Sequence, residues 1–486
     1  MPCCMSDALG WCGALPIKYN DGQGHEFCIF HAPEGKKGVE TEEFNNAVFT
    51  YIDEQKKTNQ KCNLSGTIFD GYIDFSRYHE ENPLPILHLN NAVFPFGVSF
   101  SQTSFAKGAG FSGAKFFAGA DFGGASFQGR ASFLLAVFKD DADFSSARFE
   151  GEAVFKQAKF TNLTRFLNTC FCDKADFFET ELRGKAYFIK TMFLQKASFA
   201  GTFFNAETDF STAEFFADSD FSGASFDGRT DFSSTSFAGE TSFAETIFKK
   251  RVYFKNATFK DRTLFHNVNL EDVTFDRADL SKVSFMGANL RKVDLVIPKW
   301  PKRHGRDMLP DETEARTNEE FIRVGMLYRM LKQKCKEQHD EAEASNWHYG
   351  EKEMYRKSNS YRRFFPLSLS NLYWFSSGYG ERPVRAFVVL VFLFLTASFL
   401  SACSGLICTA NSCYGIARIG VEWPYCPQWD QIGATMLNTL NYVTFQKEAL
   451  FHPTGMLGDL VRIVFQLLIP LQTALLVLAV RNRFRR

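Results

Sequence analysis

Phenylalanine recurs at a fixed spacing through the middle of this chain. The series begins Phe100, Phe105, Phe111, Phe116, Phe122 and Phe127, runs to Phe177, and resumes from Phe188 to Phe265. Steps of five and six residues alternate, so the period is eleven, and it shortens to five between Phe265 and Leu295. A small residue stands two positions before many of the large ones. Neither the 3.6-residue period of a helix nor the two-residue period of a flat strand explains this spacing.

A chain that turns a corner every five or six residues does explain it. Four such segments close a square coil, and the large residues and their small neighbours fill its interior. Asp, Ser, Lys and Gly take the outward positions. With coils stacked at strand spacing, the pattern predicts a mainly β solenoid over residues 62–295, of about ten coils and roughly 45–50 Å in length. The extra residue of each six-residue step is predicted to form a small bulge at every second corner.

The last part of this region, RADLSKVSFMGANLRKVDL (277–295), resembles the A-(D/N)-L-x-x units of the pentapeptide-repeat family. The resemblance implies a right-handed quadrilateral β-helix, from which the eleven-residue period of the earlier coils departs. Such solenoids offer surfaces rather than chemistry. The sequence contains no nucleophile–base arrangement, so we expect a protein that is not an enzyme and whose solenoid binds an unidentified protein. The balance of 55 basic and 55 acidic residues argues against a nucleic-acid partner.

Cysteines gather at the N-terminus, in a segment of residues 1–40. Cys28-Ile-Phe-His31 has the CxxH spacing of a zinc knuckle, and Cys4 and Cys12 would complete a tetrahedral site. In the cytoplasm such thiols favour metal over disulfide. We therefore predict a structural zinc ion on Cys4, Cys12, Cys28 and His31, with free buried or surface thiols as the alternative.

Four further segments are assigned from composition and periodicity. Residues 41–61 are predicted to form an amphipathic helix that caps the solenoid, since terminal repeats need a cover. The charged, Pro-rich residues 296–317 are predicted to be a linker. Residues 318–360 carry two helical patterns and are predicted to form a hairpin. Residues 361–385 are predicted to be an interfacial segment.

Two apolar stretches, Ala386–Ile407 and Leu460–Val480, are long enough as helices, at about 30 Å, to cross a lipid bilayer. Arginines precede the first and follow the second, in the basic tail 481–486. The positive-inside rule therefore places both termini in the cytoplasm. The N-terminus has no basic-then-apolar pattern of a secretory signal, which agrees with that topology. We predict a multi-pass protein of a bacterial-type inner (cytoplasmic) membrane.

The predicted extracytoplasmic loop, residues 408–459, contains an uncharged stretch over 431–446. It is short for a span and suits a re-entrant helix. Span, half-helix and span is the layout of tetrameric cation channels, and this part resembles the pore module fused to some bacterial pentapeptide-repeat proteins. No TVGYG-like filter string follows the half-helix. Gly378-Tyr379-Gly380 precedes the first span on the cytoplasmic side, so it cannot be that filter and is predicted to be a turn.

Polar residues of the half-helix and second span are candidates for a pore lining: Thr439, Asn441, Thr444, Gln466, Pro470 and Thr473. Packing between helices is the alternative role for the last three. Disulfides are predicted among Cys403, Cys408, Cys413 and Cys426, with open connectivity. We expect an oligomeric ion-channel-like pore, with a tetramer favoured because one two-span chain cannot enclose a pore. The alternative function is a membrane-anchored scaffold without conduction.

Overall fold

The computed structural model describes residues 3–303, 305–358, 368–404, 406–408, 418–419, 429–445, 451–453 and 455–484. The chain divides into two compact units, Met1–Glu314 and Ala315–Arg486.

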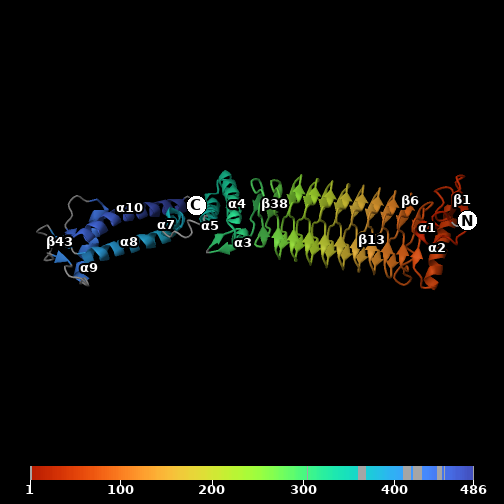
Figure 1. Ribbon diagram of the computed structural model, residues 1–486, viewed down its shortest axis with the longest axis horizontal. Coiled ribbons are helices and arrows are strands. Elements are labelled where there is room, and N and C mark those ends of the chain that lie inside the picture. Colours follow the sequence, from red (N-terminus) through yellow and green to blue (C-terminus); the bar gives the residue numbers. More distant parts are fainter. Residues whose placement is uncertain are drawn as a thin grey trace. The chain divides into compact units, whose positions relative to one another are not determined.

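A parallel β-solenoid of about eleven turns forms most of the first unit (Figure 1). Two of its four walls are eleven-stranded sheets, which run from β3 (Cys62–Asn63) to β39 (Val283–Ser284) and from β4 (Ile73–Asp74) to β40 (Asp294–Val296). The other two are eight-stranded and run from β6 (Val93–Phe94) to β34 (Ile247–Phe248) and from β8 (Ser104–Phe105) to β36 (Thr258–Phe259). The fold class predicted from the spacing is confirmed, with one turn more than expected.

The phenylalanines form vertical columns inside the solenoid. Phe155 is fully buried between Phe133 and Phe177, with ring centroids 4.8 Å away on each side and nearly parallel planes. Within one layer the rings meet edge to face, as Phe144 does with Phe155 at 5.4 Å and 88°. These are the two geometries that aromatic quadrupoles prefer. The large inward residue of each step therefore belongs to the core. Each ring stacked on its neighbour also fixes the alignment of one coil with the next.

The corners explain the eleven-residue period. Every eleventh residue has a left-handed backbone, as in Leu135 (φ 58°), Ser146 (φ 58°), Gln157 (φ 54°) and Asn168 (φ 54°). These residues lie in the five-residue steps, where a turn closes with a bond such as Ala147 N–H to the carbonyl of Phe144 (3.0 Å). The six-residue steps, such as 149–155, turn through a bend. The extra residue thus falls at every second corner, as predicted.

The N-terminal end of the solenoid is covered by helix α2 (Thr41–Lys57). Its apolar face buries Phe44, Val48 and Ile52. Phe44 contacts the Phe69 ring of the first coil edge-on, with centroids 6.0 Å apart. The predicted capping helix is therefore present, and it shields the apolar end of the first coil from water.

The C-terminal end is covered by the segment predicted to be a linker, and that prediction is wrong. A hairpin of β41 (Lys302–Arg303) and β42 (Arg306–Asp307) and the short helix α3 (Asp311–Glu314) follow the last coil. Trp300 and Leu309 are buried, and the Asp311 carboxylate accepts bonds from the hydroxyl of Ser284 (2.6 Å) and the N–H of Phe285 (3.0 Å). The charge and proline content suggested a linker because most side chains of the segment are polar. The few apolar residues that hold it on the solenoid have little weight in its composition.

The second unit begins with the predicted helical hairpin, α4 (Asn318–Glu337) and α5 (Glu341–Ser358). Thr317 and Glu320 form a capping box at the start of α4, which satisfies two backbone donors. Tyr328 and Trp347 are buried between the two helices, with ring centroids 5.9 Å apart. Helix α7 (Leu369–Ser377) lies in the segment predicted to be interfacial.

Two long apolar helices could cross a membrane, α8 (Pro383–Ser404) and α10 (Met456–Phe484). Between them in sequence, α9 (Trp429–Val443) overlaps the predicted re-entrant stretch, starting two residues before it and ending three residues short of its end. A small antiparallel sheet joins β43 (Leu406–Cys408) to β44 (Arg418–Ile419) and β45 (Phe451–Pro453). Cys403 lies at the end of α8, whereas Cys413, Cys426 and the Cys408 side chain fall outside the described residues.

The Gly378-Tyr379-Gly380 tripeptide is the predicted turn, between α7 and α8. All three residues have left-handed backbones, with φ of 56°, 62° and 77°. Tyr379 is buried, and its hydroxyl lies 3.3 Å from the Glu353 carboxylate of α5. The Asn482 amide of α10 donates to the Gly380 carbonyl (3.0 Å). The turn therefore ties the hairpin to both long helices.

We expect Phe155→Ala to lower the free energy of unfolding by about 3–5 kcal/mol, because it removes a ring from a closed column. Urea unfolding of the full chain in detergent, followed by far-UV circular dichroism of the β signal, measures this change. Phe117→Ala is the matched control: Phe117 faces outward and is 49% exposed, so its effect should stay within about 0.5 kcal/mol. Equal effects of the two substitutions would contradict the inward column.

Candidate functional site

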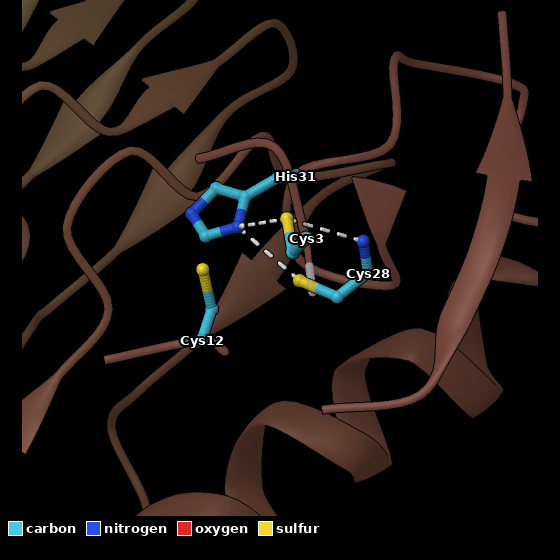
Figure 2. A group of neighbouring side chains, drawn as sticks. All are labelled: Cys3, Cys12, Cys28 and His31. Atoms are coloured by element: carbon cyan, nitrogen blue, oxygen red, sulfur yellow. Dashed lines mark hydrogen bonds between the residues drawn. The ribbon is translucent and has the colours of Figure 1, made fainter. Parts of the chain in front are cut away.

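Four side chains meet in a buried cluster at the N-terminal end of the solenoid: Cys3, Cys12, Cys28 and His31. Their potential ligand atoms all lie within 4.8 Å of one another. A tetrahedral zinc ion with Zn–S bonds of 2.3 Å would place neighbouring ligand atoms about 3.8 Å apart. Figure 2 shows the three sulfurs and the imidazole gathered around a common centre. The cluster could hold a metal ion.

The cluster differs from the predicted ligand set in one residue. Cys12, Cys28 and His31 are brought together as predicted, but Cys4 is exposed and outside the cluster, and Cys3 takes its place. The backbone N–H of Cys4 bonds the carbonyl of Glu26 (2.7 Å), and the N–H of Cys28 donates to the Cys3 sulfur (3.4 Å). This pairing directs the Cys3 side chain inward. Two adjacent cysteines give no sequence indication of which one points to the site.

His31 is oriented for coordination through Nδ1. Its Nε2 lies 3.1 Å from the carbonyl oxygen of Ser65 in the first coil, so Nε2 carries the proton and donates it. Nδ1 then presents a lone pair, 3.2 Å from the Cys28 sulfur and 3.6 Å from the Cys3 sulfur. Burial also lowers the pKa of His31, which favours the neutral ligand form. A second partner that fixes the tautomer is a general feature of metal-binding histidines.

A buried lysine, which sequence reasoning missed, supports the loop from Cys28 to His31. The Lys37 ammonium donates to the carbonyl oxygens of Ile29 (2.8 Å) and Ala32 (3.0 Å) and lies 4.5 Å from the centre of the Phe44 ring. Burial lowers the pKa of Lys37 to about 8. The Trp11 ring packs against the His31 ring, with the two ring centroids 5.2 Å apart. The site is thus preorganised by groups that bind no metal themselves.

The second unit places the predicted pore residues in three different environments. Thr444, Pro470 and Thr473 line an open, mostly apolar cavity of about 520 Å³ with Leu390, Val391, Phe394, Leu440, Val443 and Ile469. Thr439 and Asn441 are instead buried. Thr439 Oγ1 donates to the Thr435 carbonyl (2.9 Å) and lies 3.0 Å from Ser398 Oγ of α8. Gln466 is half-buried and is not among the lining residues.

A neighbouring amide, Gln472, was not singled out by the sequence pattern. Its side-chain nitrogen donates to the carbonyl oxygens of Ser376 (2.9 Å) and Ala386 (2.8 Å). Gln472 thereby joins α10 to the end of α7 and the start of α8. An amide side chain in an apolar helix could have indicated such a helix-to-helix bond.

The solenoid repeats match known family models. Residues 210–258 and 221–269 match a model of pentapeptide repeats in nine copies, and residues 262–296 match one in eight copies. Residues 210–296 of the solenoid belong to the pentapeptide-repeat family. A similar solved structure is the pentapeptide repeat protein HetL, involved in heterocyst differentiation regulation in the cyanobacterium Nostoc sp.. It has 14% identity, covers 53% of this chain and 98% of its own, and gives a TM-score of 0.25. No curated protein matches the sequence.

For the pentapeptide-repeat protein we expect Cys3→Ser to weaken Zn²⁺ binding by at least about tenfold, because it removes a ligand. Cys4→Ser, the matched control one residue away, should leave the affinity unchanged. Competition with a chromophoric zinc chelator measures both. Loss of affinity in Cys4→Ser with retention in Cys3→Ser would show that the sequence-based ligand set was the right one.

Zinc affinity should rise with pH. Burial raises the pKa of Cys12 to about 12 and that of Cys28 to about 11. Both thiols are therefore protonated near neutrality without metal, and each must release a proton to bind. The apparent association constant should then increase by about a hundredfold per pH unit or more around pH 7. The same competition assay at several pH values tests this slope, and a pH-independent constant would contradict thiolate ligation.

Proposed function

We propose that this pentapeptide-repeat protein is a membrane protein whose second unit assembles, in several copies, into an ion-channel-like pore. The observation that carries the proposal is the packing of α9 against both long helices. Tyr442 of α9 is buried with Ala397 of α8 and with Phe465 and Ile469 of α10. A helix of 15 residues is about 22 Å long, too short to cross the hydrocarbon core.

The apolar outer surface of these helices supports a lipid bilayer as their surroundings. Phe387, Phe392 and Phe399 of α8 and Leu467 and Leu471 of α10 are among the exposed large residues. A half-length helix beside them ends within the membrane, where its unpaired backbone groups need protein or water as partners. Neighbouring copies of the chain would supply that shield. This requirement favours self-association over a lone anchor.

The open cavity supports the same assembly. One copy leaves the groove around Thr444 and Thr473 open on one side. Since a two-span chain cannot enclose a pore, copies arranged around an axis would close it, and four is the number that the span, half-helix, span layout favours. The two threonines would then offer hydroxyl oxygens at a mostly apolar constriction.

The arginines that flank the two helices favour an inner-membrane topology with both termini, and hence the solenoid, in the cytoplasm. In this non-enzymatic role the solenoid would sense a stimulus or bind a protein partner. We propose zinc as the ion of the Cys3, Cys12, Cys28 and His31 cluster, because three thiolates and one imidazole are a ligand set of structural zinc. Its role would be to fix the N-terminal segment on the first coil.

A membrane-anchored scaffold is the second candidate. The observation that favours it is the burial of Thr439 and Asn441 inside the chain's own helix packing. Side chains used in this way are not available to line a pore. In the scaffold, the two long helices would hold the solenoid at the membrane and α9 would only brace them.

Single-channel recording of purified protein in planar bilayers tests the pore. We expect a unit conductance that changes in Thr444→Val and Thr473→Val, which remove hydroxyls from the cavity but keep the side-chain shape. Thr396→Val is the matched control, since Thr396 lies on α8, is half-buried and is not among the cavity-lining residues. A strictly monomeric preparation without conductance would contradict the pore and favour the membrane-anchored scaffold.

A further inference from the structure

A pair of thiols lies on the outer surface of the solenoid, far in sequence from the N-terminal cluster. Cys170 belongs to strand β20 (Cys170–Phe171), and Cys172 follows it. Phe171 between them points into the core, so both cysteines point outward, because side chains alternate along a strand. Their sulfurs lie 3.4 Å apart. Cys170 is buried and Cys172 is half-buried.

A third sulfur lies on the next coil. Met192, in strand β24 (Met192–Phe193), pairs in register with Cys170, and its side chain is 38% exposed. Neighbouring strands are separated by about 4.8 Å, so the Met192 side chain leaves the same face as the two cysteines, one strand away and within reach of them. The solenoid register therefore brings two thiols and one thioether to one surface point.

The surroundings suit a compact, weakly hydrated ion. Leu194 and Phe216 lie on the same face, 37% and 51% exposed, and form an apolar border. Arg148 pairs in register with Cys170 on the preceding coil, and its Nη1 lies 3.8 Å from the Cys170 sulfur. The same guanidinium pairs through Nε with the Glu150 carboxylate at 3.1 Å, so it is shared between this carboxylate and the negative charge that develops on the sulfurs.

We propose that Cys170, Cys172 and Met192 form a surface binding site for a soft monovalent metal ion, Cu(I). Thiolate and thioether ligands select Cu(I) over harder ions. Binding releases the two thiol protons to solvent and forms two thiolate bonds and one thioether bond, with no change in oxidation state. The resulting site has a net charge of −1 and lies against the Arg148 guanidinium, which also pairs with Glu150. It differs from the N-terminal cluster, whose imidazole and three thiols suit tetrahedral zinc.

The test is Cu(I) titration of the full chain in detergent against a chromophoric Cu(I) chelator. A phosphine reductant keeps the thiols reduced, and prior loading with Zn²⁺ occupies the N-terminal cluster. We expect wild-type protein to bind one more equivalent of Cu(I) than Cys172→Ser. Cys4→Ser, which removes an exposed thiol elsewhere, should match the wild type.

Met192→Leu tests the third ligand without removing a thiol. It should keep the stoichiometry but weaken Cu(I) binding by at least about tenfold. Met326→Leu is its matched control, because Met326 is 50% exposed on α4. Equal Cu(I) uptake by wild type and Cys172→Ser, with circular dichroism showing both folded, would overturn the site. Unchanged affinity in Met192→Leu would overturn the three-sulfur assignment. A Cys170–Cys172 disulfide that forms in air and resists the phosphine would also overturn it.

Discussion

The stacking of phenylalanine rings in register is the interaction on which the solenoid depends. Most rings lie between two others 22 residues away, as Phe122 does between Phe100 at 5.0 Å and Phe144 at 4.8 Å. Such pairs contribute about 0.5–1.5 kcal/mol each beyond the burial of their surface. Because a ring that slipped by one residue would turn to the outside, the columns fix the register of all four sheets. The outward residues are then also aligned coil by coil.

This alignment places equivalent residues of successive coils above one another, both inside the solenoid and on its outer surface. Threonines at small inward positions repeat one bond, as Thr180 does with the Phe155 carbonyl (2.8 Å) and Thr202 with the Phe177 carbonyl (2.7 Å). On the outside, Lys159 and Glu181 pair across adjacent coils at 3.0 Å. The same registration places Cys170 beside Met192. A surface site in this fold needs no loop, only suitable residues 22 positions apart.

A stack of coils leaves two apolar ends, and the chain covers each by a different means. At the N-terminus, α2 packs on the first coil, and the Cys3, Cys12, Cys28 and His31 cluster is bonded to that coil through His31 and Ser65. At the C-terminus, the Asp311 carboxylate binds the backbone of the last turns, and burial raises its pKa. In the second unit, buried amides and hydroxyls such as those of Gln472 and Ser398 form hydrogen bonds that join the apolar helices to one another and to α7.

The sequence by itself determined the solenoid, its corners, the capping helix, the hairpin and the presence of two apolar helices, whose ends differ by three or four residues from the predicted ones. Each of these follows from a local periodicity or from a long stretch of uniform composition. Both kinds of signal lie entirely within one continuous segment of the sequence. Only the tertiary structure decided that Cys3 and not Cys4 joins the cluster, since adjacent residues differ only in the direction the folded backbone gives them. It likewise decided that the predicted linker folds up to Glu314 as a cap on the last coil, that Thr439 packs against Ser398 while Thr444 lines the cavity, and that Met192 pairs in register with Cys170. Those outcomes depend on contacts between segments far apart in the chain, which no local pattern records.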